Sequence, residues 1–219
     1  MEKIHTEIIP AINSESFLEV KEKIEKVRNR TRWIHIDVAD RTFTENVLWH
    51  NPAELKDYLA ENPDLRIEVH LMVQHPEAVV AQWIEAGAKR IIVHVETMTD
   101  FFAIKKLCDE GKVLLTLAIG PETPAQVLDE YFGQKIVCYL VLSVPPGRAG
   151  QLFMESSYDK IRYIREKIPY ADIEVDGGVK PGIARTCKEA GANLFAAASA
   201  IFSHENPGRA IEELKKEVA

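Results

Sequence analysis

The chain has little cysteine, and the cysteines it has are scattered along its 219 residues. Only Cys108, Cys138 and Cys187 occur, and no two of them form a Cys-x-x-Cys pair. An odd number of distant cysteines predicts neither a disulfide framework nor a zinc site built from thiolates. This pattern is typical of a reducing compartment, so we expect a cytoplasmic protein.

Long apolar runs and an excess of positive charge are also missing. No stretch reaches the roughly 18 apolar residues of a membrane span, and the N-terminal MEKIHTEIIP lacks the shape of a signal peptide. The 27 basic residues are outnumbered by 34 acidic ones, which gives a net charge of −7. We therefore expect no membrane and no nucleic acid as partner, although a locally positive pocket for a phosphorylated small molecule is compatible with this balance.

Short apolar segments recur at a steady interval along the chain, in which 46% of the residues are hydrophobic. They are continuous rather than alternating in polarity, which is typical of strands in a parallel sheet covered on both faces. We predict strands over residues 7–12, 33–38, 67–73, 90–96, 113–119, 136–144, 172–179 and 194–199.

Amphipathic segments separate these strands and follow the last one, with apolar residues three to four positions apart as in a helix with one buried face. Pro52 and Pro207 stand near predicted helix starts. Gly87, Gly111 and Gly191 stand near predicted ends, where we expect a left-handed backbone. The predicted helices cover residues 16–30, 52–61, 76–87, 100–111, 123–132, 157–168, 181–191 and 206–218.

Eight strand–helix units in succession predict an α/β fold, a single (β/α)8 TIM barrel over residues 1–219. A doubly wound open sheet is the alternative. EAGAKRIIV (85–93) and EAGANLFAA (189–197) share one helix-to-strand layout four units apart, which favours the barrel. Helix-to-strand joints that reuse the same residues explain the repeat equally well.

Polar side chains stand near the ends of several predicted strands, where a barrel builds its active site. His35 and Asp37 are two residues apart and so project from one face of a strand. His70 and Asp176 lie in apolar segments of the same kind. A buried charge is costly unless it is paired or binds a metal, so two imidazoles and two carboxylates predict a site for a divalent ion. Each residue alone fits a hydrogen-bonded core position as well.

His94 and Glu96 end the fourth predicted strand. We interpret both as structural, either as hydrogen-bonding partners inside the barrel or as partners of the metal ligands.

Glycine-containing loops follow the last predicted strands. They are SVPPGRAGQ (143–151), DGGV (176–179) and AAASAIF (196–202), the last of which enters a short predicted helix. In barrels the loops after strands 7 and 8 often hold a phosphate group through backbone N–H groups. A glycine after a strand usually marks only a turn, but the three loops together predict a phosphate site.

Six motifs resemble those of the ribulose-phosphate 3-epimerase family, in the same order and over nearly the whole chain: HIDVAD, VHLMV, LAIGPETP (117–124), SVPPGRAGQ, VDGG and GANLFAAASAIF (191–202). The resemblance implies a (β/α)8 barrel that binds one divalent metal ion (zinc, iron, manganese or cobalt). It implies inversion of C3 of a ketose phosphate, D-ribulose 5-phosphate to D-xylulose 5-phosphate, through a metal-stabilised enediolate in the pentose phosphate pathway. It also implies a homo-oligomer.

The functional residues of the family map onto this sequence by the same motifs. The implied metal ligands are His35, Asp37, His70 and Asp176. Asp37 and Asp176 are also the implied acid–base pair on opposite faces of the substrate. The implied substrate and phosphate contacts are His70, Met72, Gly147, Gly150, Gly177, Gly178, Ala198 and Ser199.

Six positions depart from the family pattern while the metal set stays complete: Ala11, Ala39, Arg41, Leu142, Arg148 and Ala198. Arg148 either contacts an anion or is a solvated loop arginine. These changes leave two alternatives open, an epimerase of a hexulose 6-phosphate and a non-catalytic barrel that binds a phosphosugar. The Asp-x-Lys-x-x-Asp signature of related decarboxylase barrels is absent from EVHLMVQHP (68–76), which argues against that branch.

Overall fold

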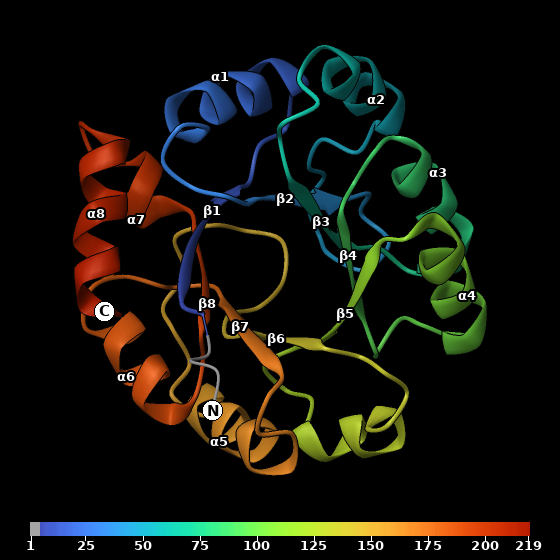
Figure 1. The fold of residues 1–219 in the computed structure, drawn as a ribbon, viewed down its shortest axis with the longest axis vertical. Coiled ribbons are helices and arrows are strands. Elements are labelled where there is room, and N and C mark those ends of the chain that lie inside the picture. Colours follow the sequence, from blue (N-terminus) through green and yellow to red (C-terminus); the bar gives the residue numbers. More distant parts are fainter. Residues whose placement is uncertain (1–4) are drawn as a thin grey trace.

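The computed structural model describes residues 5–219; residues 1–4 of the predicted domain lie outside the described residues. Eight parallel strands close into a barrel in chain order, and the helices form an outer ring (Figure 1). β1 pairs with β8 as well as with β2, so the predicted barrel is confirmed and the open sheet is excluded. The strands are β1 (Glu7–Ile12), β2 (Ile34–Ala39), β3 (Ile67–Met72), β4 (Arg90–His94), β5 (Leu114–Ile119), β6 (Cys138–Leu142), β7 (Asp172–Asp176) and β8 (Leu194–Ala197).

Apart from two segments, the helices follow the predicted amphipathic segments, and α7 is the short helix expected after the last strand. Side-chain N-caps stabilise the first turn of four helices. In each, a side-chain oxygen accepts a hydrogen bond from a backbone N–H of that turn, and the capping residues are Ser16, Asn51, Asp100 and Asn206. Among residues 5–219, no helix combines the length and the apolar character that a bilayer crossing requires. The helices are α1 (Phe17–Val27), α2 (Pro52–Glu61), α3 (Val80–Glu85), α4 (Phe101–Gly111), α5 (Ser157–Lys167), α6 (Ile183–Ala190), α7 (Ser199–Phe202) and α8 (Pro207–Glu217).

Two helix predictions need correction. The segment predicted as a helix over 123–132 is a 3-10 helix, η2 (Ala125–Tyr131), whose buried residues Ala125 and Leu128 are three apart and so share one face at three residues per turn. The helix predicted over 76–87 is divided into a 3-10 turn, η1 (Pro76–Ala78), and α3.

Gly111 was expected to end α4 in a left-handed conformation, and that expectation was wrong. Lys112 adopts the positive φ of 54° instead, whereas Gly111 belongs to the helix. A Cβ atom at Gly111 would lie 2.6 Å from Cγ2 of Ile84, so glycine serves close packing of α4 on α3. Gly87 and Gly191 do have the expected positive φ values, 98° and 121°.

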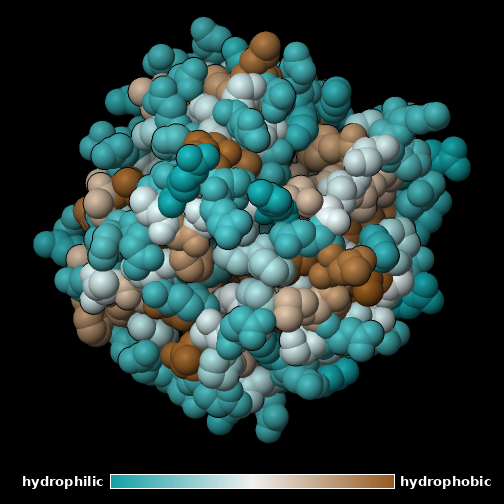
Figure 2. Space-filling view, turned by 180° about the vertical axis from the view of Figure 1, so that it is seen from behind, coloured by the Kyte–Doolittle hydropathy of each residue, from teal (hydrophilic) through white to brown (hydrophobic). Residues whose placement is uncertain are grey.

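The apolar core has an outer and an inner part. The outer part fills the space between strands and helices and holds most of the large buried side chains. Inside the barrel, one cluster contains Trp33 and Cys138 and another contains Leu140 and Leu142. Each large side chain that is fully buried contributes about 1.5–3 kcal/mol relative to an exposed one. The face shown in Figure 2 is mostly hydrophilic, with hydrophobic side chains in small separate groups.

The register of the strands decides which side chains meet at the carboxyl end of the barrel. Asp37 of β2 is paired with His70 of β3, and Asp176 of β7 is paired with Leu142 of β6. The two aspartates therefore approach the barrel opening from walls separated by β1 and β8.

Candidate active site and metal centre

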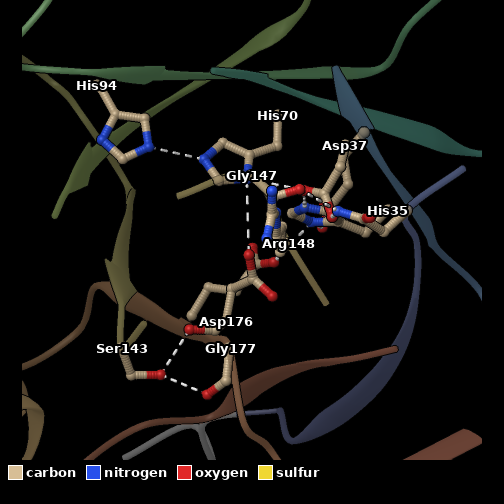
Figure 3. A network of polar contacts seen from close by, with 12 residues as sticks. His35, Asp37, His70, His94, Ser143, Gly147, Arg148, Asp176 and Gly177 are labelled. Atoms are coloured by element: carbon tan, nitrogen blue, oxygen red, sulfur yellow. Dashed lines mark hydrogen bonds and ion pairs between the residues drawn. The ribbon is translucent and has the colours of Figure 1, made fainter. Parts of the chain in front are cut away.

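Four side chains from three strands converge at the carboxyl end of the barrel (Figure 3). Asp37 Oδ1 lies 3.2 Å from His35 Nε2 and 3.1 Å from His70 Nδ1. Asp176 Oδ2 lies 3.6 Å from the same His70 Nδ1. All four residues are buried. The structure therefore brings together the four residues that the sequence indicated as metal ligands.

Burial and mutual contacts shift the pKa values of these groups in different directions. Burial alone would raise the pKa of Asp37, but hydrogen bonds with both histidines outweigh it and hold the pKa well below its usual range. Burial and then the charge of Asp37 raise the pKa of Asp176 to about 7. Burial lowers the pKa of His70 to about 4, whereas the carboxylates around His35 overcome its burial and raise its pKa. The two aspartates thus differ in basicity although both contact His70.

A buried ionic group lies on the other side of His35. His35 Nδ1 is 2.8 Å from Glu68 Oε1 and 3.2 Å from Glu174 Oε1. Arg90 Nη1 donates to the other oxygen of each glutamate, at 2.6 and 3.4 Å. Carboxylates that face Nδ1 hold a proton of the ring there, so in a neutral ring the Nε2 lone pair points toward the cluster.

None of these three residues was predicted from the sequence, although a signal existed for two of them. Glu68 and Glu174 each stand two residues before a predicted ligand, His70 and Asp176, and residues two apart on a strand share a face. Arg90 opens β4 and gave no comparable signal.

His94 contacts the cluster from the far side of His70 (Figure 3). Its Nε2 lies 2.9 Å from His70 Nε2, and its Nδ1 lies 3.1 Å from Glu96 Oε2. The other oxygen of Glu96 accepts the backbone N–H of Gly120 at 2.6 Å. Burial would raise the pKa of Glu96, but the hydrogen bond with His94 outweighs it, and the pKa is about 2. His94 and Glu96 are thus hydrogen-bonded inside the barrel, as the structural interpretation predicted, and a role beside metal ligands stays a prediction.

A cavity opens beside Asp37 and Asp176. Its apolar wall includes Met72, Leu142 and Val144. The segments after the last strands supply much of the rest, with Gly147, Arg148, Gly150, Gly177, Gly178, Ala198 and Ser199. Of the implied substrate and phosphate contacts, all but His70 line this cavity, and their contact with a substrate stays a prediction.

The two glycines after β7 are required by the backbone. Gly177 and Gly178 have φ values of 95° and 68°, in the region that disfavours side chains. A Cβ at Gly177 would lie 2.5 Å from Val144 Cγ2, and one at Gly178 would lie 2.8 Å from the backbone nitrogen of Phe153. Ser143 Oγ is 2.6 Å from the carbonyl oxygens of Asp176 and Gly177 and so fixes the start of this loop.

Two asparagines on the opposite side of the barrel opening donate hydrogen bonds to the loop after β6. Asn13 Nδ2 lies 3.1 Å from Asp37 Oδ2 and 3.2 Å from the carbonyl oxygen of Gly147. Asn46 Nδ2 donates to the same carbonyl at 2.7 Å. Neither asparagine was predicted from the sequence. The signal for Asn13 was its position directly after the first strand, where the barrel rule places functional residues.

The donor atoms of the cluster fit a divalent metal ion. One ligand atom from each of His35, Asp37, His70 and Asp176 lies within 4.8 Å of the others. Two imidazole nitrogens with two carboxylate oxygens are donors that zinc, iron and manganese accept. Glu68 and Glu174 also approach His35 closely enough for a metal, but Arg90 already supplies positive charge there.

Comparison with known proteins decides the family. Residues 7–202 match the sequence profile described as "Ribulose-phosphate 3 epimerase family". The chain belongs to the ribulose-phosphate 3-epimerase family. The ribulose-phosphate 3-epimerase of Escherichia coli K12 is 33% identical, over 97% of this chain and 96% of its own length. The chloroplastic ribulose-5-phosphate-3-epimerase of Arabidopsis thaliana is 36% identical, over 95% of this chain and 75% of its own.

Solved structures agree with the barrel. A crystal structure of a 3-hexulose-6-phosphate synthase superposes with a TM-score of 0.75 and 18% identity, over 97% of this chain and all of that one. The 3-keto-L-gulonate-6-phosphate decarboxylase of Vibrio cholerae superposes with a TM-score of 0.75 and 14% identity, over 99% of this chain and 98% of that one. At these identities the likeness shows the fold alone.

The departures from the ribulose-phosphate 3-epimerase pattern fall into two groups. Leu142, Arg148 and Ala198 line the cavity, whereas Ala11, Ala39 and Arg41 do not belong to its lining. Ala11 and Ala39 are fully buried, and Arg41 is exposed with a φ of 68°. Only the first group lines the cavity beside the two aspartates.

Proposed function

We propose that this protein is a metal-dependent 3-epimerase of a ketose phosphate, with D-ribulose 5-phosphate and D-xylulose 5-phosphate as its substrate pair. The observation that supports it most is the convergence of Asp37 and Asp176 on His70 Nδ1 beside a cavity. Membership of the ribulose-phosphate 3-epimerase family supports the reaction type.

His35, Asp37, His70 and Asp176 would hold one divalent ion, either zinc, iron, manganese or cobalt. When bound, the ion supplies the positive charge that acidifies the C3 proton and stabilises an enediolate. His35 would bind through Nε2 and His70 through Nδ1, because these nitrogens face the aspartates.

Asp37 and Asp176 would exchange the proton at C3. One carboxylate removes the proton from one face, and the other carboxyl group delivers a proton to the opposite face, which inverts the carbon without a redox cofactor. After one turnover the first group has gained a proton and the second has lost one, so the reverse turnover or exchange with water resets the pair. Their positions on walls separated by β1 and β8 suit attack from two sides.

The loops after β7 and β8 would hold the phosphate group. Gly177, Gly178 and Ser199 bring backbone to the cavity, and Arg148 brings the positive charge that an anion prefers. Met72 and Leu142 would exclude water from the reacting carbon.

The two candidate reactions differ in the length of the ketose phosphate, which has five carbons in one and six in the other. Leu142 and Ala198 change the cavity lining relative to the family pattern, which keeps a hexulose 6-phosphate as the second candidate. A non-catalytic barrel is disfavoured, because four buried ionisable residues without a ligand would destabilise the fold.

The test is turnover of D-ribulose 5-phosphate by metal-loaded protein, compared with a six-carbon ketose phosphate. We expect formation of D-xylulose 5-phosphate, loss of activity with a chelator, and a higher kcat/KM for the five-carbon substrate. A higher value for the six-carbon substrate would favour the second candidate. No turnover of either by metal-loaded protein would contradict the proposal.

We also propose a cytoplasmic location and a homo-oligomer. The three cysteines are buried and unpaired, as expected in a reducing compartment. Light scattering of the purified protein measures the oligomeric state directly, and a monomer would contradict that part of the proposal.

A further inference from the structure

A hydrogen-bonded chain ends on His70 from the side opposite the aspartates. The backbone N–H of Gly120 donates to Glu96 Oε1 at 2.6 Å, and Glu96 Oε2 lies 3.1 Å from His94 Nδ1. His94 Nε2 lies 2.9 Å from His70 Nε2. The remaining nitrogen of His70, Nδ1, faces Asp37. The chain therefore joins a backbone donor to the nitrogen that faces the cluster.

With a neutral His94 ring, the first two members determine the direction of the hydrogen bonds along the chain as far as His70. A backbone N–H only donates, and an ionised carboxylate only accepts. His94 must then hold its proton on Nδ1, and a neutral imidazole with a proton on Nδ1 has a lone pair on Nε2. That lone pair accepts a hydrogen bond from the Nε2–H group of His70. When a cation replaces the hydrogen bond between His70 Nδ1 and Asp37, His70 presents the lone pair of Nδ1 to the cluster.

We propose that Glu96 and His94 are positioning residues that hold His70 in the tautomer with a proton on Nε2, so that Nδ1 is free to bind the metal ion. This inference rests on the metal site of the proposed function. It assigns roles to two residues that the reaction chemistry does not use.

The arrangement around His35 supports the assignment independently. Glu68 and Glu174 face Nδ1 of His35 directly and leave its Nε2 for the cluster. His70 presents the opposite nitrogen, Nδ1, and the neighbour of its Nε2 is His94. Glu96 thus does for His70, through His94, what Glu68 does for His35. A carboxylate behind a metal-binding histidine fixes both the tautomer and the ring orientation.

The substitution Glu96→Gln reverses the direction of the hydrogen bonds along the chain and keeps the shape of the side chain. The N–H of Gly120 still needs an acceptor, so the amide oxygen of the glutamine stays there and its NH2 group faces His94 Nδ1. His94 then holds its proton on Nε2 and donates to His70, which places the proton of His70 on Nδ1. We expect the affinity of the metal-free protein for Zn²⁺ to fall about 10- to 100-fold, the usual effect of removing such a partner. A titration against a chromophoric chelator measures it.

Glu77→Gln is the matched control. Glu77 also accepts backbone N–H groups, those of Thr99 and Asp100, but it has no part in the chain to His70. We expect its Zn²⁺ affinity to equal that of the unmodified protein. An equal loss in both variants would overturn the proposal.

¹⁵N NMR of the histidine rings in the Zn²⁺-loaded protein gives a readout that a merely structural role would not change. We expect protons on His94 Nδ1 and His70 Nε2, and a proton on His94 Nε2 in Glu96→Gln. A proton on His94 Nε2 in the unmodified protein, or a Zn²⁺ affinity of Glu96→Gln within twofold of it, would overturn the proposal. If the unmodified protein binds no Zn²⁺, the metal site itself fails; if it binds Zn²⁺ and Glu96→Gln binds equally well, only the chain fails.

Discussion

Asp37 and Asp176 meet at a single nitrogen atom, because His70 Nδ1 lies 3.1 Å from an oxygen of Asp37 and 3.6 Å from an oxygen of Asp176. Two carboxylates this close repel each other unless a proton or a cation lies between them. Burial first, and then that repulsion, raise the pKa of Asp176 to about 7. The pair is therefore suited both to a divalent ion and to proton exchange.

Asn13→Leu tests the support of Asp37. The leucine removes the hydrogen bond from Nδ2 to Asp37 Oδ2, and a hydrogen bond to a charged group is worth about 1.5–3 kcal/mol. We expect kcat/KM for the ketose phosphate to fall roughly 10- to 100-fold. Steady-state kinetics of the metal-loaded protein measures the change.

Asn46→Leu is the control for that experiment, because Asn46 donates to the same Gly147 carbonyl but has no contact with Asp37 in the hydrogen-bond network of residues 5–219. We expect it to raise KM through the loop and to leave kcat close to the unmodified value. Equal losses of kcat in the two variants would show that the loop, rather than Asp37, is what Asn13 supports.

Arg148→Gln tests the charge at the cavity. Arg148 lines the cavity, and removal of a positive charge from an exposed rim costs up to about 1 kcal/mol, so we expect KM to rise a few-fold with little change in kcat. The effect is expected to shrink at high salt because of screening. Arg41→Gln, in an exposed loop outside the cavity lining, provides the control. A KM unchanged by Arg148→Gln would identify Arg148 as a solvated loop arginine.

The barrel and the four residues that converge at its carboxyl end were predictable because their signals are local. Each strand is a short apolar segment, and His35 and Asp37 are two residues apart on one of them. Glu68 and Glu174 could have been predicted from the same two-residue spacing. They precede the strand ends, however, and the barrel rule places functional residues at those ends. The roles of Arg90 and Asn46 could not be predicted from the sequence, since their contacts depend on residues 22 and 101 positions away.

The two wrong predictions of local structure, at η2 and at Gly111, also have physical causes. Apolar spacing of three to four residues does not separate an α-helix from the 3-10 helix η2 when the segment is short. Gly111 follows the pattern of a helix end, yet the neighbouring Ile84 determines its role by leaving no space for a side chain.

Alkaline pH is expected to destabilise the fold through the buried thiols. Burial raises the pKa of Cys108, Cys138 and Cys187 from the ordinary 9.0 to about 12. The folded chain keeps protons that the unfolded chain releases, so the stabilisation is complete below pH 9 and is lost as the pH rises toward 12. Each thiol costs about 1.4 kcal/mol of unfolding free energy per pH unit in this range.

Urea unfolding at about pH 8 and about pH 10, on either side of the ordinary thiol pKa, measures this loss, and Cys108→Ala is the comparison. The variant is expected to lose less unfolding free energy between the two pH values. The difference from the unmodified chain is the contribution of one thiol. An equal loss in the variant and the unmodified chain would show that Cys108 does not contribute.

The most direct test of the central claim combines metal content with 3-epimerase activity on D-ribulose 5-phosphate, for the unmodified chain and for Asp176→Asn. We expect about one divalent ion per unmodified chain, as a single site of this type implies. Asp176→Asn, compared at equal metal occupancy, is expected to lose activity by a factor of about 10²–10⁴, the contribution of one acid–base group. Activity of Asp176→Asn within twofold of the unmodified chain would contradict the account, as would metal-loaded unmodified protein that does not turn over the substrate.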